Sequence, residues 1–368
     1  MRGPMTEGND AHERAALQRG RIRNGFISFV VLTLGGLSLL VFYTRTPDTL
    51  RVFTQLDTPF LLLALTLTGF DLWLGGWRNH IFIRKLRPET TAWLSIRANL
   101  ANMFLASMTP AQSGGGVAQI YLWHRHGVPV PEGLSVTVIS FLSTLIVFLF
   151  AALFGITVVS ELFPQPGLRY LIRYSFVIFA VSLGFFILTL WRPELFAGLI
   201  RLLTRLLSRI KPGARDKLER AGHRAGVEIA RFHEVSSFFF RKSPGLVLLN
   251  LALTVLLYLN KFTIAYFLMR GMGVDEPYLH VLAIQALLLF IFYFAPTPGA
   301  SGIAEVSTGA LMSVLMPGYM LPVFTVMYRA LLLYIPSALG AVVLMRLLAS
   351  GVGRNTADAD QSERGGEP

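Results

Sequence analysis

Two stretches of this 368-residue sequence carry the same short motif, whose residue types suit the binding of an anion. One reads Thr109-Pro-Ala-Gln-Ser-Gly-Gly-Gly-Val-Ala-Gln119, and the other reads Thr297-Pro-Gly-Ala-Ser-Gly-Ile-Ala-Glu305. In each, the proline ends one helical segment, and the Ser-Gly pair suits the start of another. The first N–H groups of a helix have no partner within it and attract phosphate and other anions. Each motif is therefore predicted to present a helix N-terminus to an anion.

Ionisable residues within apolar segments extend this predicted site beyond the two motifs. Such residues are costly inside a membrane and are functional candidates by default. Lys261 and Arg329 could hold an anionic headgroup, with Asp71 or Glu305 as the counter-charge. The predicted lipid- or anion-binding set is Thr109, Pro110, Ser113, Gly114, Gly115, Gly116, Gln119, Thr297, Pro298, Ser301, Gly302, Glu305, Lys261, Tyr328 and Arg329. Two alternatives stay open: the ionisable residues could only pair with one another, and the glycines could only allow close helix packing.

Long apolar segments must position these residues, and their lengths match a lipid bilayer. Apolar residues make up 53% of the sequence and charged residues 15%, against about 25% charged residues in soluble domains. A spanning helix needs about 20 consecutive apolar residues. Six segments meet or approach that length: 24–43, 58–77, 133–160, 170–190, 244–269 and 322–347. Two more, 94–123 and 278–316, are broken by the motifs. We therefore expect an all-α polytopic membrane protein with six full transmembrane helices plus two re-entrant helical hairpins.

The distribution of basic residues predicts the orientation in the membrane. If both termini are cytoplasmic, the cytoplasmic segments hold 26 Lys and Arg residues and the outer loops hold 4. Because Lys and Arg accumulate on the cytoplasmic side, this asymmetry favours that orientation. It also explains the net charge of +12 without a nucleic-acid partner. The predicted membrane domain covers 24–348, flanked by cytoplasmic tails at 1–23 and 349–368, of which the second is predicted to be disordered.

The two motif-bearing units run in opposite directions in this topology. The first covers about 58–160 and the second about 244–347, and each contains one broken segment between two full spans. This inverted repeat is typical of secondary transporters, whose substrate sites lie near the membrane midplane between broken helices.

The basic linker at 192–243 separates the two repeats. Its leucines recur at helical spacing, and Arg201, Arg205 and Arg209 line the opposite side. The pattern is typical of an amphipathic helix that contacts anionic headgroups at the cytoplasmic interface. An ordinary basic linker remains the alternative.

Two residues at the end of the first broken segment, His124 and Arg125, are also predicted to contact headgroups. The His124-x-His126 pattern lacks a third ligand and therefore does not predict a metal site. The sequence contains no cysteine. We find no nucleotide-binding loop or metalloprotease motif, so we expect no cofactor.

Several of these residues carry a family resemblance. At the two T-P-x-x-S-G motifs, and at Met327-Tyr328-Arg329 followed by Pro336 and Gly340, the sequence resembles the lysylphosphatidylglycerol synthase transmembrane region, also called the flippase-like domain family. The resemblance covers about residues 25–348. It implies a bacterial or archaeal plasma (inner) membrane protein that handles lipids. The motif glycines and prolines, Glu305 and Arg329 match by position, whereas Lys261 matches no family position.

In the founding synthases of this family, the transmembrane region moves an aminoacylated lipid between leaflets, and a separate soluble domain makes that lipid. No such soluble domain is recognisable in this sequence, so the resemblance does not imply lysyl transfer. A separate cytosolic lipid-modifying enzyme would be the corresponding partner.

Together these features predict a flippase-like transporter of an anionic or polyprenyl-linked lipid rather than an enzyme. Two other functions stay open: an integral-membrane transferase or hydrolase acting on a lipid, and a non-catalytic scaffold for envelope biogenesis. The enzyme would need a nucleophile or general base facing the substrate. The scaffold predicts that substitutions at the two motifs leave activity intact.

Overall fold

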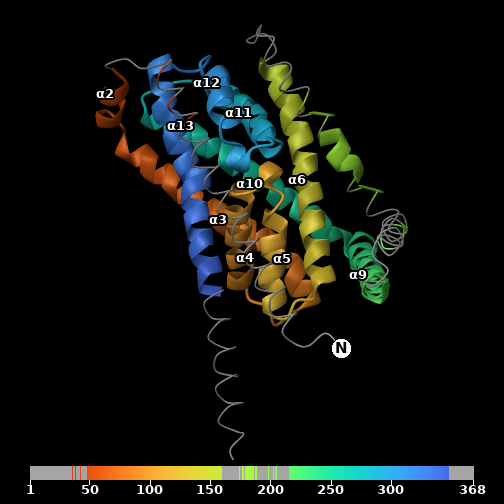
Figure 1. The fold of residues 1–368 in the computed structure, drawn as a ribbon. Helices are drawn as coiled ribbons and strands as arrows, with labels where there is room; N and C mark the ends of the chain where they lie inside the picture. Colours follow the sequence, from red (N-terminus) through yellow and green to blue (C-terminus); the bar gives the residue numbers. More distant parts are fainter. Residues whose placement is uncertain are drawn as a thin grey trace, which may run out of the picture.

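The computed structural model describes residues 48–159 and 215–347, together with scattered residues of 35–42 and 174–204. All regular structure in these residues is helical, and no strand occurs among them (Figure 1). Both predicted tails, all but three residues of the predicted span at 24–43 and part of the predicted span at 170–190 lie outside the described residues.

Four helical segments in the described residues are long and apolar enough to cross a membrane. They are α3 (Thr58–Leu86), α6 (Val130–Val159), α10 (Pro244–Gly271) and the segment Gly318–Leu347. They coincide with four of the six predicted full spans. Large apolar side chains on their outer faces are exposed, including Leu62, Phe150 and Leu248. This exposure is expected of helices that contact lipid tails rather than water.

The last spanning segment is irregular near its middle. It contains η4 (Gly318–Met320), α13 (Leu321–Arg329) and a π-helical turn, η5 (Ala330–Tyr334). Pro336 follows this turn closely, and a proline has no N–H with which to continue the regular hydrogen-bond ladder. Such π-turns are frequent at functional sites.

The end of α3 corrects one detail of the sequence prediction. The prediction ended this span at Trp77 and counted Arg78 among the cytoplasmic charges, whereas the helix continues to Leu86. Phe82 and Ile83 are fully buried, so packing of apolar side chains extends the helix beyond the predicted boundary. Arg78 therefore lies inside the helical bundle rather than in a loop.

Each motif breaks its apolar stretch into two helices, as the sequence predicts. The first stretch forms α4 (Ala92–Ser107), η1 (Pro110–Gln112) and α5 (Gly115–Arg125). The second forms α11 (Tyr278–Tyr293), η3 (Pro298–Ala300) and α12 (Ile303–Met312). Within each stretch the two α-helices pack against each other. Figure 1 shows α4 and α5 toward the lower end of the bundle and α11 and α12 toward the upper end.

Two further helices of the described chain lie outside the spanning segments and the broken pairs. The amphipathic helix α9 (Arg215–Lys242) lies within the basic linker and packs against α6 and α10, and the short helix α2 (Asp48–Thr54) precedes α3. Glu132 at the start of α6 accepts hydrogen bonds from Arg87 Nε at 2.9 Å and Nη2 at 2.8 Å. This contact with Glu132 raises the pKa of the Arg87 guanidinium above its ordinary value. The bidentate pair fixes the end of α3 against α6.

Candidate functional site: a cavity between two broken helix pairs

The two motif breaks meet inside the bundle. η1 contacts η3, and the Ala111 N–H donates a hydrogen bond of 3.2 Å to the Ala295 carbonyl. The breaks also share an unusual backbone: φ is 49° at Ala111 and 56° at Gln112, and 57° at Gly299 and 56° at Ala300. Left-handed φ values are uncommon for residues other than glycine and mark functional or strained sites. The sequence repeat therefore corresponds to a repeat of backbone geometry.

The helix N-termini that follow the two breaks differ in charge. At the first, the Gly114 N–H donates to Thr109 Oγ1 at 2.8 Å. At the second, the Gly302 N–H donates to Glu305 Oε2 at 2.6 Å, and Glu305 is fully buried. A carboxylate at a helix N-terminus offsets the positive end of the helix dipole. The start of α12 is thus already neutralised from within the chain, while the start of α5 has only a neutral hydroxyl.

Arg329 lies beside this second N-terminus and contacts it through three groups. Its Nη1 is 2.7 Å from Glu305 Oε1, as an ion pair whose orientation does not meet hydrogen-bond geometry. Its Nη2 donates to the Gly299 carbonyl at 3.0 Å and to Ser301 Oγ at 3.2 Å. The Arg329 side chain therefore ties α13 to η3 and α12, and it is only 4% exposed.

A second buried ion pair joins two spanning helices. Lys261 Nζ of α10 lies 2.5 Å from Asp71 Oδ2 of α3. The Asp71 side chain is 2% exposed, and its Oδ1 has no hydrogen-bond partner among the described residues. The four ionisable residues singled out in the sequence thus form two pairs, which is one of the two arrangements that the sequence left open.

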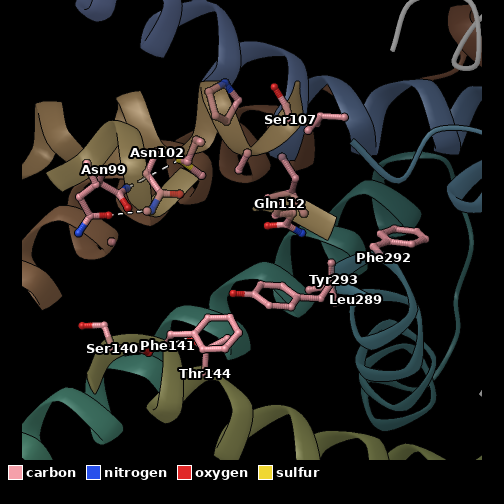
Figure 2. A pocket seen from close by; sticks show the side chains of 18 of the residues that line it. Asn99, Asn102, Ser107, Gln112, Ser140, Phe141, Thr144, Leu289, Phe292 and Tyr293 are labelled. Atoms are coloured by element: carbon pink, nitrogen blue, oxygen red, sulfur yellow. Dashed lines mark hydrogen bonds between the residues drawn. The ribbon is translucent and has the colours of Figure 1, made fainter. Parts of the chain in front are cut away.

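A cavity of about 680 Å³ lies between the two helix pairs and the spanning helices. Figure 2 shows Asn99 and Asn102 of α4 on one side, with Ser140 and Thr144 of α6 across from them. Asn102 Nδ2 donates to Gln119 Oε1 at 2.7 Å. Apolar side chains of α6 and α11 complete the wall: Phe141, Phe148, Leu289 and Phe292. The cavity is therefore amphipathic, with polar groups and an apolar wall in one space.

The predicted binding residues divide into those that line this cavity and those that build the breaks. The residues lining it are Ser113, Gly116, Gln119, Lys261, Tyr328 and Arg329. The predicted residues absent from the lining are Thr109, Pro110, Gly114, Gly115, Thr297, Pro298, Ser301, Gly302 and Glu305. Most of this second group form or brace the two breaks.

The motif glycines have different local roles. A Cβ on Gly115 would lie 2.5 Å from Asn102 Oδ1, and one on Gly114 would lie 2.7 Å from Thr109 Cγ2. These two glycines therefore allow close packing around the first break. Gly302 instead has a φ of +83°, and a Cβ there would meet no atom within 4 Å. The requirement for glycine at position 302 is one of backbone conformation.

The predicted interfacial residues lie elsewhere. His124 and Arg125 are exposed in the last turn of α5, outside the cavity. Arg201, Arg205 and Arg209 fall outside the described residues. Within the part of the chain that the structure describes, no group of three or more His, Cys, Asp or Glu side chains could hold a metal ion.

Apart from Asp71, the polar face that α3 presents to the cavity was not predicted from the sequence. Asp71, Gly75, Arg78 and Asn79 all line it. Their spacing of four, seven and eight residues from Asp71 is that of one helix face. A helical projection of residues 71–79 would have found this face had the predicted span not ended at Trp77.

The fold and the cavity together define a class of protein: a multi-pass helical membrane protein with an amphipathic cavity between broken helices. Residues 26–340 match the family described as the lysylphosphatidylglycerol synthase TM region, and the chain belongs to this family. A protein of Archaeoglobus fulgidus described as a UPF0104 membrane protein is 21% identical over 313 residues, which cover 85% of this chain and 94% of that protein. These matches confirm the family resemblance seen in the sequence and indicate a lipid-related role in a membrane.

Proposed function

We propose that this protein translocates an anionic or polyprenyl-linked lipid between the leaflets of the plasma membrane. The amphipathic cavity among the spanning helices is the observation that carries this proposal. Its volume of about 680 Å³ falls within the roughly 300–1,000 Å³ range of small-ligand sites, which suits a headgroup. Its amides and hydroxyls can replace water around that headgroup, while its phenylalanine wall suits the start of an acyl or prenyl chain.

The arrangement of the two breaks supports a transport path rather than a closed binding pocket. In this proposal the two broken pairs are re-entrant hairpins that enter from opposite sides and touch at η1 and η3. The two units would form an inverted repeat, so movement of one unit against the other would open the cavity to each leaflet in turn. Irregular backbone is tolerated at membrane depth only where protein or a polar cavity surrounds it; Ala111, Gln112 and Ser113 of the first break line the cavity, and Pro298 and Ala300 of the second are buried.

The charged residues favour transport over lipid hydrolysis or transfer. A general base or nucleophile must be free to reach the substrate. Asp71 pairs with Lys261, and Glu305 pairs with Arg329 and caps α12. Each carboxylate is therefore held in a buried ion pair, which favours its charged form and disfavours its use as a general base.

Leaflet exchange in proteoliposomes tests the proposal. Vesicles carry a fluorescent anionic lipid, and dithionite quenches the label in the outer leaflet only. We expect the wild-type protein to expose the inner-leaflet label at least tenfold faster than empty vesicles do. Exchange no faster than in empty vesicles, across several anionic and polyprenyl lipids, would overturn transport in favour of the enzyme or the scaffold.

The same assay separates binding from proton coupling at the Glu305–Arg329 pair. Arg329→Gln alone would leave a buried carboxylate unpaired, which costs about 3–5 kcal/mol of stability. The double variant Glu305→Gln/Arg329→Gln removes both charges and is expected to fold while slowing exchange. Glu305→Gln alone would likewise leave Arg329 unpaired, so its exchange is measured at a temperature at which thermal unfolding shows the variant to be folded; if Glu305 carries a proton, this folded variant should lose exchange together with its pH dependence. Unchanged exchange in Glu305→Gln would make Glu305 a structural residue.

A further inference from the structure

Arg78 is the cationic residue of the cavity wall that has no acidic partner among the described residues. It lies on α3 and lines the cavity. Its Nη1 donates to Thr144 Oγ1 at 3.1 Å and to Thr254 Oγ1 at 3.2 Å. Its Nε is buried without a hydrogen-bond partner, and no hydrogen bond from Nη2 is found in the described part of the chain. Nε is thus closed to the cavity, and Nη2 is the terminal nitrogen of the guanidinium with no hydrogen bond in the described part of the chain.

The cavity lining holds the cations Arg78, Lys261 and Arg329 and the carboxylate Asp71, and with Glu305, which pairs with Arg329 from outside the lining, these described residues leave an excess of one positive charge. Lys261 is paired with Asp71, and Arg329 is paired with Glu305. Both neighbouring carboxylates are thus already engaged. An uncompensated buried charge is costly in a protein and in a membrane. An anion from outside the chain would remove that cost.

The position of Arg78 is fixed by hydrogen bonds among three spanning helices. Asn250 Nδ2 of α10 donates to the Arg78 carbonyl at 3.2 Å and to Ser140 Oγ at 3.2 Å. Ser140 Oγ of α6 donates in turn to Asn79 Oδ1 at 2.9 Å. The guanidinium is also held by the threonines of α6 and α10. Such bracing is what a binding site needs to hold a charged group in one orientation.

We propose that Nη2 of Arg78 binds the phosphate of an anionic phospholipid within the cavity. Hydrogen bonds from a guanidinium to phosphate are charge-assisted and stronger than neutral ones, and a lysine at this position would not keep the contacts of Nη1 with the two threonines. The amides of Asn99 and Asn102 line the same cavity and can donate to the rest of the headgroup, and Phe141 and Phe148 adjoin the same space. This inference rests on the proposed function only in that the lipid reaches the cavity from the bilayer.

Binding by the purified, delipidated full-length protein tests the site. The probes are dihexanoyl phosphatidylglycerol and inorganic phosphate, followed through intrinsic tryptophan fluorescence. Arg78→Gln is expected to weaken binding of the lipid about tenfold or more. Arg78→Lys should recover only part of that loss. Arg84→Gln is the matched control, because Arg84 is exposed on the same helix outside the cavity, and it should bind as the wild type does.

The two probes distinguish a lipid from a free anion. Binding of the lipid with competition by inorganic phosphate supports a lipid phosphate at Arg78. Arg78-dependent binding of inorganic phosphate without binding of the lipid would overturn the lipid as its source. Equal loss of binding in Arg78→Gln and Arg84→Gln would mean that lipid binding depends only on the overall positive charge of the protein. That result would overturn the site.

Thermal unfolding of the delipidated variants is a second measurement. A purely structural role of Arg78 and an anion-binding role predict opposite changes in the unfolding temperature. If the charge of Arg78 is uncompensated when no anion is bound, Arg78→Gln should unfold at a higher temperature than the wild type, both measured without lipid. Added lipid should then stabilise the wild type more than the variant. A lower unfolding temperature together with equal stabilisation by lipid would overturn the proposal.

The site and the proposed function can fail separately. Lipid binding that depends on Arg78, without leaflet exchange by the wild type, would leave the site standing and reject transport. Leaflet exchange by the wild type that Arg78→Gln does not slow would keep transport and reject the site.

Discussion

Three residues other than glycine have a left-handed backbone conformation in the described chain: Ala111, Gln112 and Ala300. All three lie in the two breaks, so backbone strain is concentrated there. Gly299 occupies the matching position of the second motif, where Ala111 stands in the first. A left-handed conformation costs an L-residue with a Cβ on the order of 1–2 kcal/mol. The duplicated motif adopts this geometry in both breaks, although only the second break has a glycine at one of its two left-handed positions.

Replacing the strained alanines with glycine should therefore stabilise the protein. Ala111→Gly and Ala300→Gly are each expected to raise the free energy of unfolding by about 1 kcal/mol, because the relief of strain exceeds the added entropy of the unfolded chain. Thermal unfolding in detergent measures the change. Ala101→Gly is the control: Ala101 is buried within α4, and its loss should destabilise by a similar amount.

At the residue scale, the sequence predicted the motif chemistry but not the pairing. The repeated Thr-Pro and Ser-Gly spacing was sufficient to place both breaks, because proline and glycine act on the local backbone. The partners Asp71–Lys261 and Glu305–Arg329 depend on which helices pack together, which a single sequence does not specify. Arg78 was assigned to a cytoplasmic segment because it directly follows the apolar run that ends at Trp77. Apolar residues resume after it, and the helix continues.

At the scale of elements, α9 shows how a polar helix attaches to an apolar bundle. Phe232, Ser236 and Phe239 are buried and recur at helical spacing. The Phe239 ring packs edge-on against Phe82 of α3 with centroids 4.8 Å apart. Aromatic pairs in this geometry contribute beyond the area they bury. This contact holds the basic linker against the same end of α3 that carries Arg84 and Lys85.

Adjacent phenylalanines on α9 provide a matched test of this attachment. Phe239→Ala should lower the free energy of unfolding by about 3–5 kcal/mol, as expected for a fully buried aromatic residue. Phe240→Ala, at an exposed position, should change it by about 0.5 kcal/mol or less. Limited proteolysis within α9 should accelerate for Phe239→Ala alone. Equal sensitivity of both variants would mean that α9 does not depend on this contact.

The linker also shows where element prediction from sequence was incomplete. The leucine and arginine pattern around Arg201, Arg205 and Arg209 predicted one amphipathic helix, and that segment lies outside the described residues. The described helix of the linker, α9, begins later and mixes serine and histidine into its buried face. Its apolar pattern is too interrupted to stand out without the partner surface. The four described spans, by contrast, were predictable because their length and uniform hydropathy are local properties.

At the scale of the whole molecule, the proposed orientation follows from the charge asymmetry. The basic helix α9 lies toward the same end of the bundle as α4 and α5, and α2 and α12 lie toward the opposite end (Figure 1). The positive-inside rule assigns the α9 end to the cytoplasm. The two helix pairs would then open toward opposite sides of the membrane.

Single cysteines test this orientation cleanly, because the sequence contains none of its own. Cysteine at the exposed positions Glu228 or Asp275 should react with an impermeant maleimide from one side only. We expect Glu228→Cys to be labelled only after the inner face of the membrane is opened, and Asp275→Cys to be labelled in intact cells. Labelling of both positions from the same side would reject the proposed topology and the inverted repeat with it.

The central claim is that lipid passes through the cavity between the two breaks, and a reversible link across them tests it most directly. Ala111 and Ala295 lie on opposite breaks and share a backbone hydrogen bond, so Ala111→Cys/Ala295→Cys should form a disulfide on oxidation. Leaflet exchange is then followed by albumin back-extraction of a fluorescent anionic lipid, which adds no reductant. The account predicts that exchange stops in the oxidised protein and returns after dithiothreitol treatment, while each single-cysteine protein is unaffected by oxidation. Undiminished exchange in protein that is fully cross-linked would contradict a path between the breaks.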